Sequence, residues 1–331
     1  MGSHCNYAVI RGGVAQRYSQ KSGEGLDHYF ALGPELVLRW MDRLGTDYQR
    51  GWWAEDPICE GAVVVDADRR RLLLYTSLPA FGLAARFAYR AALLDAYART
   101  WAGWEVVWNY EGAAAFATAI GEDPAVVRSP PGFYGTLHPY PDDAKLFPDE
   151  IRSIVTVGDH GYALNHDTMD PWLLGPALIG LLDAEPRVTA ATSMPVSGLH
   201  LDPERRRAGI WSIEAYKGLT EWWPERWPGW ELELWGDDHT RQLAAAPSLT
   251  LPPIDLDAAL HELADRVRNL TPVEETMRAQ EIDVDSLRRH NFAGMRPWLE
   301  AAITPTEVEA VAALILDAGL IRDLSSWTGR R

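Results

Sequence analysis

The sequence predicts an α+β protein made of a tandem duplication of one ββαββαβ unit, followed by a C-terminal helical segment. Three sequence signatures support the duplication, because each occurs twice and in the same order. They are Gly-Pro-x-Leu at 33–36 and 175–178, an acidic turn with three arginines at 66–71 and 202–207, and Trp-x-Gly-Trp-Glu at 101–105 and 227–231. The offset between the copies falls from 142 to 136 to 126 residues, which indicates shorter connections in the second copy.

Apolar periodicity assigns each element of the first copy in chain order. A hairpin around Gly12 and Gly13 opens the copy, and Pro34 begins a helix with a single apolar stripe. A second hairpin precedes a second helix, and Gly103 stands where a helix C-cap glycine belongs. The predicted elements are strands 7–10 and 15–19, helix 34–44, strands 63–65 and 72–75, helix 83–101, and a strand from 105 to 108.

Proline content and periodicity divide the chain into four predicted regions. These are a first α+β repeat (1–120), a proline-rich connector (121–149), a second, acidic α+β repeat (150–247) and a helical segment (254–331). The connector holds six prolines and therefore cannot form a regular element. In the last region we expect helices at 256–270, 273–290 and 306–320, with Thr304 and Glu307 forming a capping box.

Charge separates the regions and excludes several classes of partner. The formal net charge is −16, of which residues 1–120 carry −1, residues 121–250 carry −10 and residues 251–331 carry −5. With only three lysines and this excess of acid, the chain lacks the clustered basic surface that nucleic acids require, and acidic membranes would repel it. We therefore expect no nucleic-acid or membrane partner.

The chain contains only two cysteines, Cys5 and Cys59, which cannot form a disulfide framework. No charged segment followed by an apolar stretch opens the chain, so we expect a reduced, cytoplasmic protein. Both thiols are predicted to be buried and inert.

Candidate catalytic residues come from histidine and acid clusters, since the chain contains no established catalytic or cofactor motif. The weak catalytic candidates are His160, His166, Asp167 and Asp170, together with the neighbouring pair Asp27 and His28. His200 and Asp202 follow on a predicted strand. The spacing of these groups matches no established metal site, so we predict no metal, and the sequence identifies no cofactor.

Candidate ligand-binding residues are aromatic pairs beside acids and the arginines that follow the two hairpin turns. An exposed tryptophan beside a carboxylate can stack on a flat ring or a cation, and arginine can hold a carboxylate or phosphate. The candidates are Trp52, Trp53, Trp222, Trp223, Glu225, Arg69, Arg71, Arg205 and Arg207. The alternative roles are packing for the tryptophans and solvated turns or edge-strand protection for the arginines. The tryptophans of the Trp-x-Gly-Trp motif are predicted to pack at a helix-to-strand corner.

Two functional hypotheses follow from these observations. The first is an acidic protein-binding module of immunity or regulatory type, whose second repeat captures a basic partner. The alternative is an enzyme or small-ligand binder with a site between the two repeats, lined by Trp, His and Asp side chains.

Overall fold

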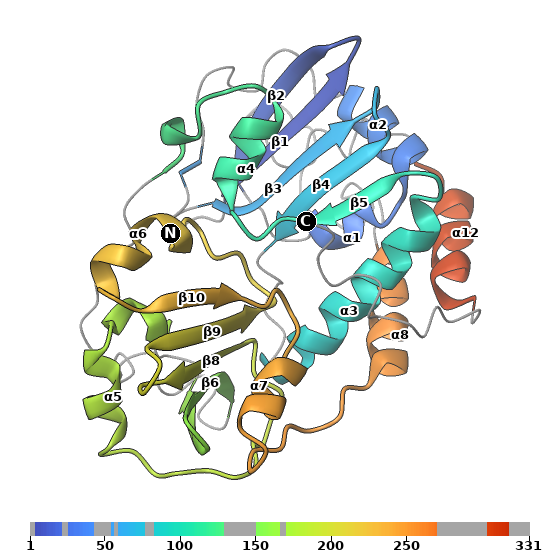
Figure 1. Cartoon of the computed structure of the whole chain (residues 1–331). Helices are drawn as coiled ribbons and strands as arrows, with labels where there is room; N and C mark the ends of the chain where they lie inside the picture. The colour runs from blue at the N-terminus through green and yellow to red at the C-terminus, as the bar shows by residue number, and fades with distance from the viewer. Residues whose placement is uncertain are drawn as a thin grey trace. The chain divides into compact units, whose positions relative to one another are not determined.

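The computed structural model describes residues 4–21, 26–42, 54–55, 59–76, 83–128, 150–165, 170–269 and 303–317. The chain divides into two compact units, whose elements are labelled in Figure 1. Unit 1 contains the sheet of the first repeat and residues 256–321, and unit 2 contains the sheet of the second repeat. Helix α3 (Leu83–Thr100) is divided, since its residues through Arg90 belong to unit 2 and the others to unit 1.

Unit 1 contains a five-stranded mixed sheet with the order β2-β1-β3-β4-β5. Its strands are β1 (His4–Arg11), β2 (Val14–Lys21), β3 (Cys59–Asp66), β4 (Arg71–Thr76) and β5 (Glu105–Trp108). Its helices include α1 (Leu26–Phe30), α2 (Pro34–Asp42) and α4 (Ala113–Ala119), with the short helix η1 (Pro124–Val126). The hairpins β1–β2 and β3–β4 are antiparallel, whereas β1 with β3 and β4 with β5 pair in parallel.

Unit 2 repeats this topology, with the order β7-β6-β8-β9-β10 and the same alternation of antiparallel and parallel pairs. Its strands are β6 (Ile151–Val157), β7 (His160–Asn165), β8 (Ser197–Asp202), β9 (Arg207–Ser212) and β10 (Glu231–Leu234). Its helices include η2 (Pro171–Leu174), α5 (Ala177–Leu182), α6 (Leu219–Arg226) and α7 (Thr240–Ala245). The predicted α+β class with a duplicated sheet unit is confirmed.

The same pair of tryptophans closes the helix-to-strand corner of each repeat. The indole Nε1 of Trp101 donates to the carbonyl of Phe30 at 2.7 Å, and that of Trp227 donates to the carbonyl of Trp172 at 2.7 Å. In both copies the ring also meets the second tryptophan of the motif edge-on, with centroids 5.1 Å apart. Because Trp101 and Trp227 are fully buried, the packing role predicted for this motif is confirmed.

The glycine of the Gly-Pro-x-Leu signature lies against the same corner. Gly33 and Gly175 have φ angles of 83° and 63°, in the left-handed region. A Cβ atom at Gly33 would lie 2.6 Å from the carbonyl oxygen of Thr100, and one at Gly175 would lie 2.5 Å from that of Arg226. Thr100 and Arg226 immediately precede the buried Trp101 and Trp227, so the two signatures are parts of one packed corner.

The C-terminal helices α8 (Leu256–Arg268) and α12 (Pro305–Leu316) pack on each other, and α8 also contacts α1. The predicted capping box is present, since the Thr304 side chain accepts from the backbone N–H of Glu307 and Glu307 bonds back to Thr304. Glu307 also accepts from Arg39 of α2 at 2.8 Å. Hydrogen bonds from Arg39 and Thr304 lower the pKa of Glu307 to about 2. The helix predicted at 273–290 lies outside the described residues.

In the described part of the chain, no helix is both long enough and apolar enough to cross a bilayer. Cys5 and Cys59 are free thiols with no exposed surface, as predicted. The thiol of Cys59 donates to the carbonyl of Gly61 at 3.1 Å, so it is part of the core of unit 1.

Candidate functional site

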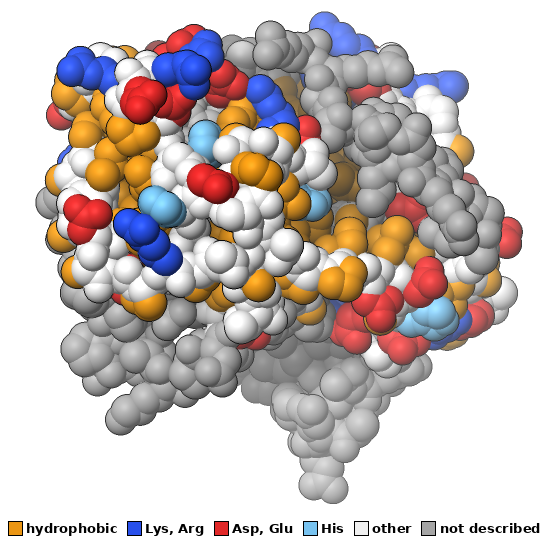
Figure 2. Space-filling view, turned by 60° about the horizontal axis from the view of Figure 1, so that its bottom comes forward, with side chains coloured by type: hydrophobic (Ala, Val, Ile, Leu, Met, Phe, Trp, Pro, Cys, Tyr) orange, Lys and Arg blue, Asp and Glu red, His pale blue; other side chains and the backbone are white. Residues whose placement is uncertain are grey.

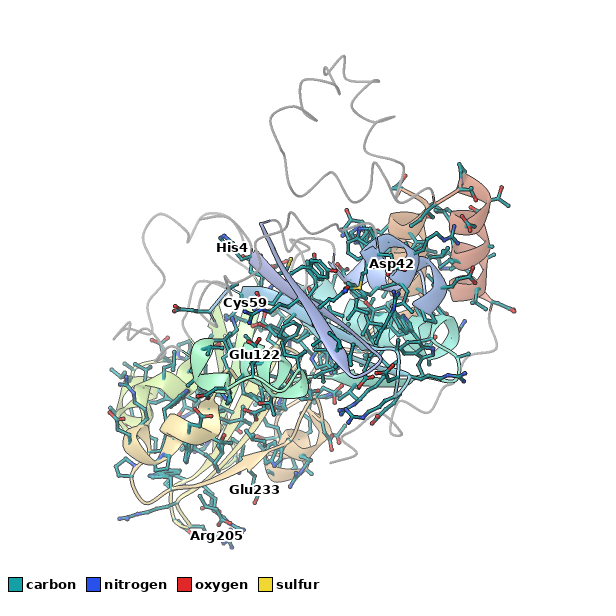
Figure 3. All side chains as sticks on the ribbon, turned by 90° about the horizontal axis from the view of Figure 1, so that it is seen from above. His4, Asp42, Cys59, Glu122, Arg205 and Glu233 are labelled. Carbon is teal, nitrogen blue, oxygen red and sulfur yellow. The ribbon has the colours of Figure 1, made fainter. Side chains whose placement is uncertain are left out.

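A pocket of about 710 Å³ opens around the β8–β9 turn of unit 2. Its walls come from the end of β6, the β8–β9 hairpin and β10. The charged and aromatic lining residues are Asp159, His200, Asp202, Glu204, Arg205, Arg207, Glu233 and Trp235. Figure 3 shows the labelled Arg205 and Glu233 at this end of the sheet.

Carboxylates outnumber cations in this pocket, because four acidic side chains face two arginines. Arg205 is paired with Asp202 at 2.8 Å, and Glu233 is paired with Arg241, outside the lining, at 2.8 Å. Arg207 lies 3.9 Å from Glu233 and pairs with Glu231 outside the lining. Among the described residues, Asp159 and Glu204 have no ion pair. Asp159 and Glu204 thus supply the carboxylates of the lining that have no ion pair, and Oδ1 of Asp159 accepts from the backbone N–H of Ser248 at 3.2 Å.

On the face seen in Figure 2, red and blue side chains adjoin one another at several places. Arginines within residues 121–250 pair with neighbouring acids, and the formal charge of −10 is what remains after these arginines are counted.

Trp235 forms an aromatic wall of the pocket. A Cβ atom at Gly209 would lie 1.8 Å from the indole ring, so the ring occupies space that only a glycine at this position leaves open. The ring stacks with His200 at 6.3 Å, and the guanidinium of Arg241 lies over it at 4.9 Å from its centroid. The Trp235 ring is therefore able to hold a guanidinium by a cation–π contact.

A buried hydrogen-bond relay leads from the core of unit 2 to His200. The Nε1 of Trp211 donates to Oε1 of Gln242 at 2.6 Å, and Nε2 of Gln242 lies 3.1 Å from Oγ1 of Thr156. Thr156 Oγ1 in turn lies 2.9 Å from Nδ1 of His200. Trp211, Gln242 and Thr156 have no exposed surface. Burial lowers the pKa of His200 below 6.5, although Asp202 and Glu233 act in the opposite direction.

Four residues of this site form one row across the sheet, which we call the polar row: Thr156, His200, Gly209 and Glu233. Each is the register partner of the next, on strands β6, β8, β9 and β10. The register of unit 1 places an apolar row at the equivalent positions, made of Ala8, Val64, Leu73 and Val107. The polar site thus belongs to the second repeat alone.

The helix after the last strand differs in the same way. Gln242 of α7 and Phe116 of α4 both stand 11 residues after the glutamate of the Trp-Glu corner that the two repeats share. Both side chains are buried. α4 packs on β3, and α7 packs on β8. Gln242 therefore supplies hydrogen bonds where the first repeat supplies an aromatic ring.

The structure separates two members of the predicted His/Asp cluster. His160 begins β7, whereas Asp170 follows the other end of that strand and precedes η2. Asp170 lies 3.3 Å from Arg152 at the start of β6, whereas His160 pairs with Val157 at the end of β6. This stretch of strand spans roughly 20 Å, so the two side chains cannot act on one group. His166 and Asp167 lie outside the described residues. No group of three or more metal-ligating side chains occurs among the residues that the structure describes.

Asp170 belongs instead to a charged cluster at the start of β6. Nη2 of Arg152 lies 3.3 Å from Asp170 and 3.0 Å from Glu214, and Arg86 approaches Glu214 at 3.5 Å. Burial raises the pKa of Asp170, whereas the neighbouring Arg152 and Arg86 outweigh burial and lower that of Glu214. Arg152 forms ion pairs with both carboxylates, which indicates a structural role for Asp170.

The pair Asp27 and His28 lies at α1 of unit 1, with Oδ1 and Nδ1 3.5 Å apart. Asp27 has no exposed surface, and its backbone carbonyl accepts from the Tyr97 hydroxyl at 2.6 Å. The structure therefore places the two predicted residues within the packed core of unit 1.

The aromatic candidates have different locations. Trp52 and Trp53 lie outside the described residues. Trp222 and Trp223 lie in the helix α6. Trp223 is buried and stacks on Trp227 at 4.9 Å, whereas Trp222 is half-buried and Glu225 is exposed.

The arginine candidates sit at equivalent positions of the two hairpins. Arg69 and Arg205 pair with the aspartate three residues earlier, and Arg71 and Arg207 pair with the first residue of the neighbouring parallel strand. Of the four, Arg205 and Arg207 line the pocket of unit 2.

Trp235, Glu233 and Gln242 were not predicted as site residues. Aligning the copies at the Trp-Glu corner would have set Trp235 against Asn109 and Gln242 against Phe116, which is the signal that the sequence offered. Comparisons of the chain with protein-family models, with curated proteins and with solved structures find no match.

Proposed function

We propose that unit 2 is a protein-binding module whose pocket receives a basic side chain of a partner. The observation that carries this proposal is the excess of carboxylates in the pocket, where Asp159 and Glu204 have no ion pair among the described residues. Trp235 adds a ring that already holds one guanidinium, that of Arg241. A guanidinium entering the pocket would gain charge-assisted hydrogen bonds.

The first repeat supports this assignment by contrast. Its equivalent row is apolar, and the net charge of residues 1–120 is only −1. The two copies therefore share a scaffold and the acidic hairpin turn, whereas Glu233 and His200 have no polar counterpart, and Trp235 has no aromatic counterpart, in the first copy.

The test is the binding of the full chain to a labelled Gly-Arg-Gly-Arg-Gly peptide, with the citrulline version as the neutral control. Removal of Asp159 and Glu204 by D159N/E204Q should weaken binding by about tenfold or more, since each lost charge contact is worth on the order of 1 kcal/mol. The matched control is D183N/E185Q, which removes the same charge elsewhere in unit 2. Equal weakening by both variants would mean unspecific attraction and would overturn the proposal.

A small-ligand binder is the second candidate, because about 710 Å³ lies within the usual range for small-molecule sites of roughly 300–1,000 Å³. Salt distinguishes the two functions. Capture of a basic protein depends on long-range attraction and should weaken strongly towards ~1 M salt, where the Debye length is only ~3 Å. Binding of free arginine with little salt dependence, and no affinity for the peptide, would favour the second candidate.

A further inference from the structure

We propose that His200 is the specificity-determining donor of the pocket: a buried relay holds its imidazole as the Nε2–H tautomer, so the pocket selects a basic group that carries a carbonyl oxygen beside it. This inference rests on the proposed function, because it names what accompanies the basic side chain. The chemical class is an arginine or lysine residue within a peptide, recognised through its side chain and its main-chain carbonyl.

The orientation of the Gln242 amide is fixed by its neighbours. The Trp211 indole N–H can only donate, so the atom that it meets at 2.6 Å must be the amide oxygen. The amide nitrogen then lies 3.2 Å and 3.0 Å from the carbonyl oxygens of Ile154 and Leu199, which can only accept. Both ends of the amide therefore agree on a single orientation.

This orientation decides the direction of the Thr156 hydroxyl. Thr156 has no exposed surface, and its two hydrogen-bonding partners are the Gln242 amide nitrogen and Nδ1 of His200. The amide nitrogen is a donor, so among the described residues only Nδ1 is able to accept the hydroxyl proton. A buried hydroxyl left without an acceptor would cost roughly 1–3 kcal/mol, which favours Nδ1 as the unprotonated nitrogen.

The proton of the neutral ring must then sit on Nε2. His200 lines the pocket, and its Nε2 is not among the buried polar atoms that lack a partner. Nε2–H is therefore available to a ligand as a hydrogen-bond donor. Asp202 of β8, Glu233 of β10 and the guanidinium of Arg207 of β9 line the same pocket, while Thr156 is the uncharged neighbour on β6.

The pocket offers both acceptors and a donor, so a matching ligand needs both a cation and an acceptor oxygen. The unpaired carboxylates accept hydrogen bonds from a cation, whereas Nε2–H donates to an oxygen that accepts. A peptide arginine or lysine supplies both within one residue, but a free polyamine supplies only the cation. Thr156 and Gln242 are positioning residues, since they act on the ligand only through His200.

The experiment has two readouts on the full chain. The first is the ¹⁵N spectrum of the histidine rings, in which His200 should show an unprotonated Nδ1 and a protonated Nε2 at pH 7. Thr156→Val is nearly isosteric and should abolish this preference, whereas Thr156→Ser should restore it. A spectrum with the proton on Nδ1 in the unmutated protein would overturn the inference.

The second readout compares acetyl-arginine N-methylamide with butylguanidine, which carries the same single guanidinium charge without a carbonyl. The unmutated chain should bind the amide about tenfold more tightly, as expected for one hydrogen bond of ~1.4 kcal/mol. His200→Leu and Thr156→Val should lose this preference, and Thr156→Ser should keep it. Equal affinity of the unmutated chain for both compounds would leave the proposed function intact and show that this inference is wrong. If neither compound binds, the proposed function fails together with it.

Discussion

The two sheets share their strand order, strand directions and register, yet one row of side chains differs completely between them. In unit 1 the row is apolar, and in unit 2 the polar row opens onto the pocket. The corner formed by glycine and tryptophan is unchanged, with indole-to-carbonyl distances of 2.7 Å in both copies. The residues that maintain the fold and those that form the site therefore occupy separate positions of one repeated scaffold.

The largest effect on this comparison is expected from Gln242→Leu. The substitution leaves the buried N–H of Trp211 without its acceptor and removes the donor to Thr156 and two carbonyls, which should lower the free energy of unfolding by roughly 3 kcal/mol. The matched change in the first repeat, Phe116→Leu, loses only packing and should cost about 1–1.5 kcal/mol. Urea denaturation of both variants measures the difference. Equal losses would show that the relay contributes nothing beyond packing.

A somewhat smaller and symmetric effect is expected from alanine at Gly33 or Gly175. Each Cβ would lie about 2.5 Å from a backbone carbonyl oxygen and would adopt an unfavourable positive φ, so each variant should lose roughly 2 kcal/mol. Thermal unfolding of the two single variants provides the measurement. A large loss at only one of the two sites would contradict the equivalence of the corners.

The smallest effect is expected from the arginines of the hairpin edges. Arg71→Gln and Arg207→Gln each remove an exposed ion pair with the first residue of the adjacent strand, and such pairs contribute little in water. Neither variant should shift the urea midpoint measurably. A clear shift for Arg207→Gln alone would identify its carboxylate partners as a structural network of the second repeat.

Local signals explain which parts of the fold were predictable. The last strand of the first repeat was predicted to begin at Glu105, where the structure begins it, because a C-cap glycine and a run of β-formers mark this start. The capping box at Thr304 and the duplicated corner were likewise visible, since each depends on residues close together in sequence. The short helices α1, α4 and α7 were not predicted, because five to seven residues carry too little periodicity.

The site was less predictable, because its residues meet only through sheet register. Thr156 and Gln242 are 86 residues apart, and nothing near either one indicates the contact between them. Conversely, His160 and Asp170 are close in sequence, but His160 begins β7 and Asp170 follows the other end of that strand. Proximity in sequence misleads wherever an extended strand separates two groups, and the comparison of aligned copies is the better guide.

The placement of the C-terminal helices also determines the order in which the protein can be completed on the ribosome. α8 and α12 belong to unit 1, and the ion pair between Arg39 and Glu307 joins residues 268 positions apart. The nascent chain therefore emerges with all five strands of the second sheet before the last helices of unit 1 have been synthesised. During translation, the surface of the first repeat that α8 will cover stays exposed until α8 and α12 have been synthesised.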